Sequence, residues 1–594
     1  MRSLQSDALA AASDGIVSQE VSVLAGTGCH GKYKSNVERD FARRVKRLLD
    51  INVDPYEVSV QTDPSDPNSV IKIFMVLPHE MFATLWWEHT EVAEQRMIGG
   101  ECVREFWQIA ADCDEPFFKN HPMKAAILAD MNSHIPIRVW GDDAPVGKHG
   151  HGIRTISWAA AATREVESFQ AKNLVWAVDQ KAVPLEAEPQ LFDVLAWSLD
   201  ALASGVYPGV GPDGKQLSGK RAALQGQRLS PWGHKGIYTQ TTGDWKFLNE
   251  IYHFPWTQNT EQCCRACGAV KSQGDMNYAD ARPDAPWTAP DARRTDQEYF
   301  EAVLASHGRL PPLCRVIGWS NDTVLDDLVH DDLLGVRLNL LGSALKDMSD
   351  HNFWSAPMIG GTWQAKVNHQ LEHCYRKFKT FCRSKQLEHS FTRFKVTSIS
   401  MTSLSSWPEL KSKAHNSAVL TLFLSEELRV EVPKRTTLPD RFRVLSSTMW
   451  GFAASYVVIS NSSQRLSLEE VSLLEEARAA ALQGYHFLSL DSATRGVYMF
   501  YIQPKFHKMD ESLRKAIRTR RSPAWWWTFS DESFIGMVAK LSASCHKKTL
   551  GRRVVQRWLA TYFSELRCLD GTPRNSLKLQ RVRSLNLQRS LSGH

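Results

Sequence analysis

Alternating hydrophobic and polar positions predict a group of short strands that begins near residue 135. Ile135, Ile137 and Val139 recur at every second position, which is the period of a strand that buries one face. This strand is expected to end at the acidic segment Gly141-Asp142-Asp143. Similar patterns predict three further strands over residues 153–158, 174–178 and 236–244.

A helix separates the third predicted strand from the fourth. Leu191, Leu195, Leu199 and Leu202 fall on one helical face, and Gly205 follows as a stop signal. The predicted order is strand, strand, strand, helix, strand, with carboxylates after the first and fourth strands. This order predicts a mixed α/β fold, an α+β arrangement built on a mixed sheet.

Composition places the 594-residue chain among globular proteins of several domains. Hydrophobic residues make up 43% and charged residues 23%, and no segment approaches the run of about 20 apolar residues that a bilayer span needs. We therefore expect no membrane association, and the amino terminus lacks the apolar stretch of a secretory signal. The 11 cysteines are then expected to be reduced thiols or metal ligands rather than disulfides.

Charge is distributed unevenly along the chain. Residues 511–594 contain 17 Lys and Arg against 5 Asp and Glu, whereas the whole chain carries a net charge of only +6. A basic segment attracts polyanions by releasing their counterions, which favours nucleic acid as a partner. A solvated basic tail is the alternative.

The acidic strand ends are candidate ligands for divalent cations. Asp142 or Asp143 and, after the fourth strand, Asp244 supply the carboxylate oxygens that Mg²⁺ or Mn²⁺ prefers. Two such ions about 4 Å apart stabilise the attacking and leaving oxygens in phosphodiester cleavage. The alternative is structural: residues 142–145 form an ordinary turn, and Asp244 caps a helix that follows it.

The cysteine-rich segment 263–267 is a candidate zinc site. Cys264 and Cys267 form a C-x-x-C pair, which is half of a typical structural site. Because the second half is not evident, a cluster of reduced buried thiols is an equal alternative. Candidates for the missing ligands are Cys263, His253, Cys314 and His330.

A basic and aromatic stretch suits nucleic-acid binding. Cations interleave with aromatic residues over 375–395, so that the former could bind phosphates while the latter stack on exposed bases. An amphipathic helix with its aromatics in the core is the equal alternative. The candidate DNA contacts are Arg376, Lys377, Lys379, Arg383 and Lys385, together with Lys505, Arg552 and Arg553 nearer the carboxyl terminus.

Several blocks in the same order resemble a group of eukaryotic cut-and-paste DDE transposases. The segment 243–249 followed by the C-x-x-C pair is similar to a block in which Gly-Asp and Asn precede two cysteines. Residues 326–336 resemble that group's Asp-Ile-Met-His-Asp-Leu-Leu-Glu-Gly-Val block. Residues 504–507 and 527–532 resemble its Pro-Lys-His-His block and the Phe-Glu that supplies the last catalytic acid.

This resemblance implies a ribonuclease-H-like core that cleaves DNA and transfers strands with two Mg²⁺ or Mn²⁺ ions. The implied triad is Asp142 or Asp143, Asp244, and Glu532 or Asp531. It also implies transposon ends and target DNA as partners, a homo-oligomer and a nuclear location. Two departures, Leu334 in place of Glu and the altered spacing before Asp531-Glu532, leave a domesticated, non-catalytic DNA-binding or assembly protein as the alternative.

The distance between the acids predicts an insertion. Asp244 and Glu532 are 288 positions apart, and one insertion helix is evident from the capping box Ser467-Leu468-Glu469-Glu470, with a stop expected at Gly484. The predicted organisation is a flexible segment (1–35), a mostly helical region (36–130), the first part of the core (131–255), the insertion with its cysteine-rich knuckle (256–500), the last part of the core (501–565) and a basic tail (566–594).

Overall fold

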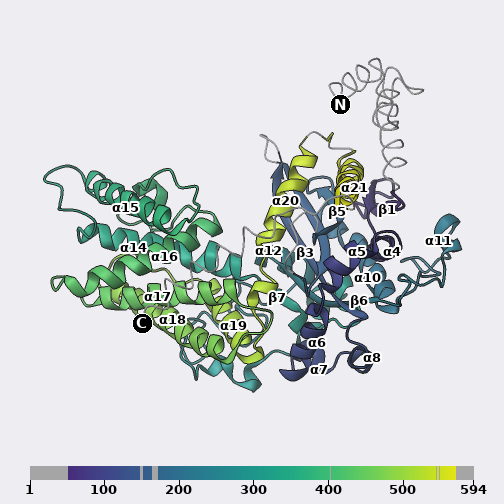
Figure 1. Ribbon diagram of the computed structural model, residues 1–594, viewed down its shortest axis with the longest axis horizontal. Coiled ribbons are helices and arrows are strands. Elements are labelled where there is room, and N and C mark those ends of the chain that lie inside the picture. Colours follow the sequence, from purple (N-terminus) through teal and green to yellow (C-terminus); the bar gives the residue numbers. More distant parts are fainter. Residues whose placement is uncertain are drawn as a thin grey trace, which may run out of the picture.

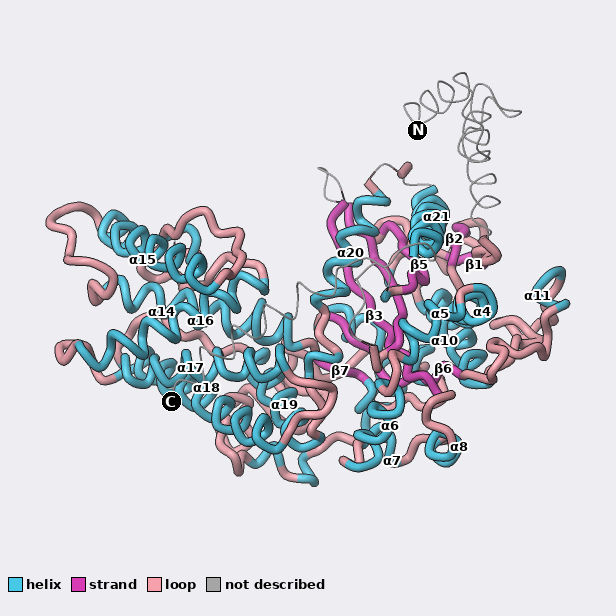
Figure 2. Tube along the Cα trace, in the orientation of Figure 1, coloured by secondary structure: helices cyan, strands magenta, loops and turns pink. Residues whose placement is uncertain are grey.

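The computed structural model describes residues 51–146, 151–163, 171–401, 403–543, 545–546 and 549–569. The described strands include a mixed five-stranded sheet in the order β5-β4-β3-β6-β7 (Figure 2). β3, β4 and β5 are antiparallel neighbours, whereas β6 runs parallel to β3 and β7 parallel to β6. The mixed α/β class predicted from the sequence is confirmed. The strands are β3 (His134–Val146), β4 (His151–Ala160), β5 (Asn173–Asp179), β6 (Lys235–Gly243) and β7 (Val324–Asp326).

Helices from distant parts of the chain cover this sheet. α10 (Pro189–Ser204) packs against β6, and it ends at Gly205 in the left-handed conformation, as predicted. α20 (Phe529–Ser542) packs against β3, and α21 (Leu550–Leu569) packs against β5. In Figure 1 these two carboxyl-terminal helices, coloured yellow, lie beside strands of the amino-terminal half.

Two parts of the sheet differ from the sequence prediction. β3 does not end at the acidic segment 141–143 but continues to Val146, because its antiparallel pairing with β4 extends to Val146 opposite His151. β7 was not predicted, since three residues are too few to show a period.

The amino-terminal region predicted as mostly helical also contains a hairpin. β1 (Tyr56–Gln61) pairs with β2 (Val70–Met75), and the backbone N–H of Val76 donates to Val175 of β5 at 2.8 Å. The predicted lead-in 1–35, residues 36–50 and residues 570–594 of the basic tail lie outside the described residues. The helices that follow the hairpin are α4 (Pro78–Glu88), α5 (Thr90–Ala93), α6 (Cys102–Asp112), α7 (Pro116–Lys119) and α8 (Lys124–Ala129).

A second, mostly helical body lies on the other side of the molecule in Figure 1. It has its own hydrophobic core, in which Leu340, Phe423 and Phe452 are buried. The sequence predicted a mostly helical insertion over residues 256–500. Its helices are α14 (Arg337–Asp350), α15 (Trp363–Lys385), α16 (Ala414–Glu431), α17 (Arg441–Asn461), α18 (Leu468–Thr494) and α19 (Pro504–Thr519).

The packing places the ends of the helical body differently from the predicted boundaries. α13 (Asp296–His307), assigned to the insertion, buries Tyr299 and Val303 in the core of the sheet. α19, assigned to the catalytic core, buries Phe506 in the helical core.

α18 begins at the predicted capping box, with Ser467 Oγ accepting from the Glu470 N–H. It continues past Gly484, where a stop was predicted. A Cβ at this position would lie 2.1 Å from Thr448 Oγ1 on α17, so the glycine permits close helix packing instead of ending the helix.

α17 is the one described helix that is long and apolar enough to cross a membrane. Two thirds of its apolar window, 67%, is buried inside the protein, which is typical of the core helix of a helical domain.

Candidate metal centres

The carboxylate Asp142 lies near the end of the part of β3 that pairs with β6. Gly141 pairs with Gly243, so Asp142 and Asp244 follow neighbouring positions on two parallel strands. Phe247 of α12 (Trp245–Tyr252) packs against both glycines, and a Cβ at either one would come within 2.5 Å of its ring. The two Gly-Asp pairs in the sequence therefore admit α12 close to the sheet and bring the two acids together.

Glu532 approaches Asp142 from α20. Its position in the first turn is favourable for an acid, because the amino-terminal end of a helix carries a partial positive charge. Each of Asp142, His330 and Glu532 offers a ligand atom, and the three atoms lie within 4.8 Å of one another. We call this group the carboxylate centre.

The electrostatics of the carboxylate centre favour a bound cation. Burial, together with the charges of Asp244 and Glu532, raises the pKa of Asp142 to about 8. Burial also raises the pKa of Glu532, although His330 opposes it. Oε1 of Glu532 is buried and lies 3.5 Å from the His330 Nε2. A buried carboxylate oxygen beside a second acid and an imidazole fits the donor set of a divalent ion.

Asp244 lies beside this group but has a second role. Its Oδ1 accepts a hydrogen bond of 2.6 Å from the N–H of Phe247, so it caps α12 as the structural alternative predicted. It also contributes to the raised pKa of Asp142. The capping and the electrostatic contribution coexist at this position.

The two adjacent acids, Asp143 and Asp531, lie outside the carboxylate centre. Asp143 accepts from Arg154 at 2.8 Å and from Lys246 at 2.8 Å, and although burial raises its pKa, these cations lower it overall. Successive residues of a strand face opposite sides of the sheet, which separates Asp143 from Asp142. Of each adjacent pair, Asp142 and Glu532 are therefore the acids that lie in the carboxylate centre.

Asp531 is fully buried and neutralises two cations. It accepts from Arg138 of β3 and lies 2.8 Å from the Lys172 Nζ. Burial, with the nearby Arg138 charge, lowers the pKa of Lys172 to about 8. Asp531 is thus a structural residue that fixes α20 to the sheet.

His330 joins the carboxylate centre, not the cysteines with which the sequence grouped it. Its Nδ1 lies 2.6 Å from the Asp327 Oδ2, and its Nε2 lies 3.5 Å from the Glu532 Oε1. Burial lowers the pKa of His330, but the Asp327 carboxylate dominates and raises it to about 9.

A second group of ligands surrounds the C-x-x-C pair. Cys264, Cys267 and His507 each offer a ligand atom within 4.8 Å of the other two, and all three residues are buried. The Cys267 Sγ lies 3.3 Å from the His507 Nε2, and the N–H of Ala266 donates to the Cys264 Sγ at 3.3 Å. We call this group the thiol centre.

The electrostatics of the thiol centre favour a thiolate at Cys264. Burial opposes the thiolate form of Cys264, but Cys267 as a hydrogen-bond donor and the charges of Lys508 and His507 hold its pKa well below the usual value. The pKa of His507 is raised, because Cys264 outweighs the effect of burial. A low-pKa thiolate beside an imidazole suits a soft cation such as Zn²⁺.

The other predicted zinc ligands are engaged elsewhere. The Cys263 thiol is directed to the Ala269 carbonyl oxygen at 3.7 Å. Cys314 contacts the Tyr299 hydroxyl, and His253 stacks on His307. His507 was missed, although it stands in the Pro-Lys-Phe-His block; only the fold brings it to a pair 240 positions earlier.

A buried ion pair connects the two centres. Asp326, at the end of β7, binds Arg265 of the cysteine loop at 3.0 Å and Lys508 of α19 at 3.3 Å. Lys508 follows His507 of the thiol centre, and Asp326 precedes Asp327, which holds His330 of the carboxylate centre. The chain segments that build the two centres are therefore held against each other.

α15, which carries five of the predicted DNA contacts, is an amphipathic helix. Phe378 and Phe394 are buried, so these aromatics are not available for stacking on bases. Arg376 pairs with Glu372, Lys377 with Glu427 and Lys385 with Glu426, whereas Lys379 lies over the Tyr375 ring. Arg383 is exposed.

The three remaining candidates for DNA contact differ in setting. Lys505 donates to the His330 carbonyl oxygen at 3.0 Å, close to the carboxylate centre. Arg552 lies over the Phe74 ring, and Arg553 is half-buried on the same helix, α21.

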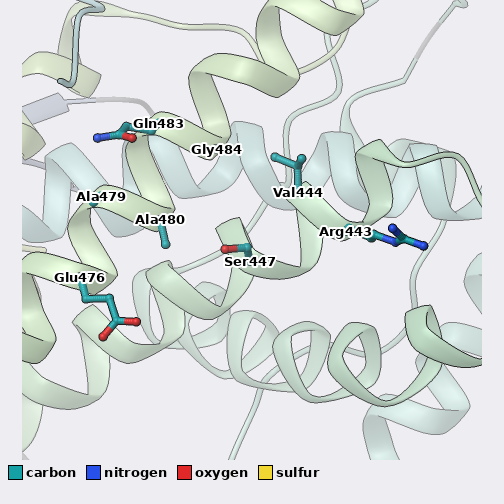
Figure 3. A pocket seen from close by; sticks show the side chains of 8 residues that line it. All are labelled: Arg443, Val444, Ser447, Glu476, Ala479, Ala480, Gln483 and Gly484. Atoms are coloured by element: carbon teal, nitrogen blue, oxygen red, sulfur yellow. The ribbon is translucent and has the colours of Figure 1, made fainter.

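A groove of about 600 Å³ opens between α17 and α18 (Figure 3). Its lining includes the small residues Ser447, Ala479, Ala480 and Gly484, together with Arg443 and Glu476. It includes none of the residues of either centre.

No protein-family model matches the chain, and no curated protein matches its sequence. The geometry of the two centres therefore carries the functional argument.

Proposed function

We propose that this protein is a DDE-type nuclease of the transposase class with a ribonuclease-H-like core. The observation that carries the proposal is the convergence of Asp142 and Glu532 beside Asp244, at one place on a mixed sheet. The sheet order β5-β4-β3-β6-β7 supports it. Asp142 lies on β3, the first of these strands in the sequence, Asp244 follows β6, the fourth, and Glu532 lies on the late helix α20. The large helical insertion between Asp244 and Glu532 fits the same plan.

The proposed chemistry is hydrolysis or transfer of a DNA phosphodiester. Asp142, Asp244 and Glu532 would hold divalent ions, which when bound stabilise the attacking and leaving oxygens of the phosphate. Asp142 and Glu532 must be in their carboxylate forms to bind. The cap at Asp244 and the ion pairs of Asp531 fix the elements that carry the ligands.

The thiol centre is proposed to hold structural zinc. Two cysteines and a histidine in a buried pocket match three of the four ligands that such sites use, and the metal would join the cysteine loop to α19. The buried ion pairs of Asp326 with Arg265 and Lys508 would then hold the segment Asp327–His330 in place beside α20.

DNA is the proposed substrate, and the basic surface of the helical body is its proposed contact. Residues 363–413 contain ten Lys and Arg against three acids. Arg376, Lys377 and Lys385 are paired with glutamates, so the proposed contact rests on exposed cations such as Lys366, Arg383 and Arg393. Such a surface binds the phosphate backbone with an affinity that falls steeply with salt. A homo-oligomer and a nuclear location follow from the same proposal, because a transposase must hold two DNA ends together in the compartment of its substrate.

Nicking of supercoiled plasmid by the purified full chain tests the proposal. We expect cleavage with Mg²⁺ or Mn²⁺, and its loss in Asp142→Asn and in Glu532→Gln, by about a thousandfold or more. Asp143→Asn is the matched control, since this neighbouring carboxylate lies outside the centre, and it should retain cleavage. Cleavage that survives Asp142→Asn would refute the assignment. Metal binding without cleavage would favour the non-catalytic alternative.

A further inference from the structure

One member of the carboxylate centre is not a carboxylate. His330 lies with its Nε2 toward Glu532 at 3.5 Å, and its ligand atom is within 4.8 Å of those of Asp142 and Glu532. Neither the capping of α12 nor the core packing of the sheet explains an imidazole at this place.

The imidazole is held by a buried carboxylate on its far side. Asp327 is 2% exposed, and its Oδ2 accepts from the His330 Nδ1 at 2.6 Å. The backbone N–H groups of Val329 and His330 also donate to Asp327, at 3.1 and 3.2 Å. This leaves Nε2 as the ring atom that faces the carboxylate centre. A histidine whose second nitrogen binds a carboxylate is the usual arrangement of an imidazole metal ligand.

The same carboxylate positions the helix that carries Glu532. Asp327 accepts from the Thr528 hydroxyl at 2.5 Å and from the Thr528 N–H at 3.3 Å. Thr528 is the residue before α20. Asp327 therefore sets His330 and Glu532 relative to each other, which is what a common ligand set requires.

The backbone at His330 is fixed as well. His330 stands in a π-helical segment, Val329–Val336, and its carbonyl oxygen accepts from the Lys505 Nζ at 3.0 Å. Short π-helical segments occur frequently at functional sites.

We propose that His330 is an imidazole ligand of the carboxylate centre, and that the centre consequently prefers Mn²⁺ to Mg²⁺. This inference rests on the proposed function. Mg²⁺ favours oxygen donors almost exclusively, whereas first-row transition metals accept an imidazole nitrogen. Among these metals, Mn²⁺ also suits a site in which carboxylates predominate.

A different role for His330 predicts the opposite change in Mn²⁺ affinity when the imidazole is removed. If the imidazole served only as a counter-cation for Asp142 and Glu532, its removal would leave the centre more negative. Mn²⁺ would then bind more tightly without it. If His330 is a ligand, its removal must weaken Mn²⁺ binding. The Mn²⁺ dissociation constant of His330→Ala therefore distinguishes the two roles.

Pulsed electron paramagnetic resonance of Mn²⁺ bound to the zinc-loaded full chain provides the direct test. We expect a ¹⁴N coupling from a directly bound imidazole in the wild type, and its absence in His330→Ala. The Mn²⁺ dissociation constant should rise at least about tenfold in that variant, while Mg²⁺ affinity, measured by competition, changes much less. Asp327→Asn should weaken Mn²⁺ binding by about ten- to a hundredfold, because the ring loses its orienting partner.

His369→Ala is the control, since this histidine lies on α15 outside the carboxylate centre, and it should leave both metals unaffected. Absence of the ¹⁴N coupling in the wild type, or tighter Mn²⁺ binding in His330→Ala, would overturn the inference. Mn²⁺ binding that is still lost in Asp142→Asn would in that case leave the proposed function intact. Binding that persists in both Asp142→Asn and Glu532→Gln would refute the proposed function itself.

Discussion

The carboxylate centre and the thiol centre differ in donor type and in burial, although both draw their ligands from distant segments of the chain. Asp142, His330 and Glu532 are each partly accessible, whereas Cys264, Cys267 and His507 are all buried. Hard oxygen donors at an accessible position suit an ion that exchanges and meets a substrate. Soft donors in a closed core suit an ion that stays bound and stabilises the fold. Burial and donor type thus distinguish a proposed reactive site from a proposed structural one.

The largest effect is expected at the thiol centre. Cys267→Ser should abolish zinc binding, measured as one zinc per chain in the wild type and none in the variant. Because a structural zinc contributes several kcal/mol to folding, the midpoint of thermal unfolding should fall markedly. Mn²⁺ affinity at the carboxylate centre should also fall, since the Asp326 pair loses its support.

Cys263→Ser is the matched control for this variant. The neighbouring thiol is buried but faces the Ala269 carbonyl, so zinc content should remain at one per chain. Equal loss of zinc in the two variants would mean that Cys263 belongs to the thiol centre.

Removing the charge of Asp531 and removing that of the adjacent Glu532 should change the stability of the protein differently. Asp531→Asn leaves Arg138 and Lys172 without their buried partner, which should cost about 3–5 kcal/mol of unfolding free energy. Glu532→Gln removes a charge that repels Asp142, so the metal-free protein should be as stable as the wild type or more stable, although it loses the metal. Chemical denaturation of both variants measures the difference. Destabilisation of Glu532→Gln to the same degree would assign Glu532 a structural role.

Metal-free protein should lose stability as the pH rises. The pKa of Asp142 is raised from its ordinary value to about 8, so the folded state holds a proton that the unfolded state has released. The contribution of this proton to the free energy of unfolding is fully present below about pH 4 and is lost as the pH rises to about 8. Melting temperatures across this range should fall more steeply for the wild type than for Asp142→Asn, and saturating Mn²⁺ should flatten the wild-type curve. Identical pH profiles in the two proteins would contradict the raised pKa.

Most strands of the sheet and the segments that carry Asp142 and Asp244 were predictable, because local patterns encode them. Ile135, Ile137 and Val139 carry the strand period, and the two Gly-Asp pairs mark the positions where α12 approaches the sheet. The choice between Asp142 and Asp143 was not predictable, because it depends on which side of β3 faces α20. That side is decided by the pairing of β3 with β4 and β6.

The partners of the two histidines could not be predicted for a related reason. His330 and His507 each stand in a recognisable block, but their ligand partners are brought together by contacts between distant segments. His507 reaches Cys267 because α19 packs beside the cysteine loop, and His330 reaches Glu532 because Asp327 binds Thr528. Such contacts arise from the packing of the helical body against the sheet and leave no periodic signal.

The smallest expected effect on stability separates the two roles of Asp244. Asn caps a helix about as well as Asp, so Asp244→Asn should preserve the hydrogen bond to the Phe247 N–H and leave the unfolding free energy nearly unchanged. Asp244→Ala removes the cap and should cost about 1 kcal/mol. Both variants remove the charge beside Asp142 and should lose metal-dependent nicking to the same extent. If Asp244→Asn nicks DNA like the wild type, Asp244 is only a helix cap, and the proposed metal site reduces to Asp142, His330 and Glu532.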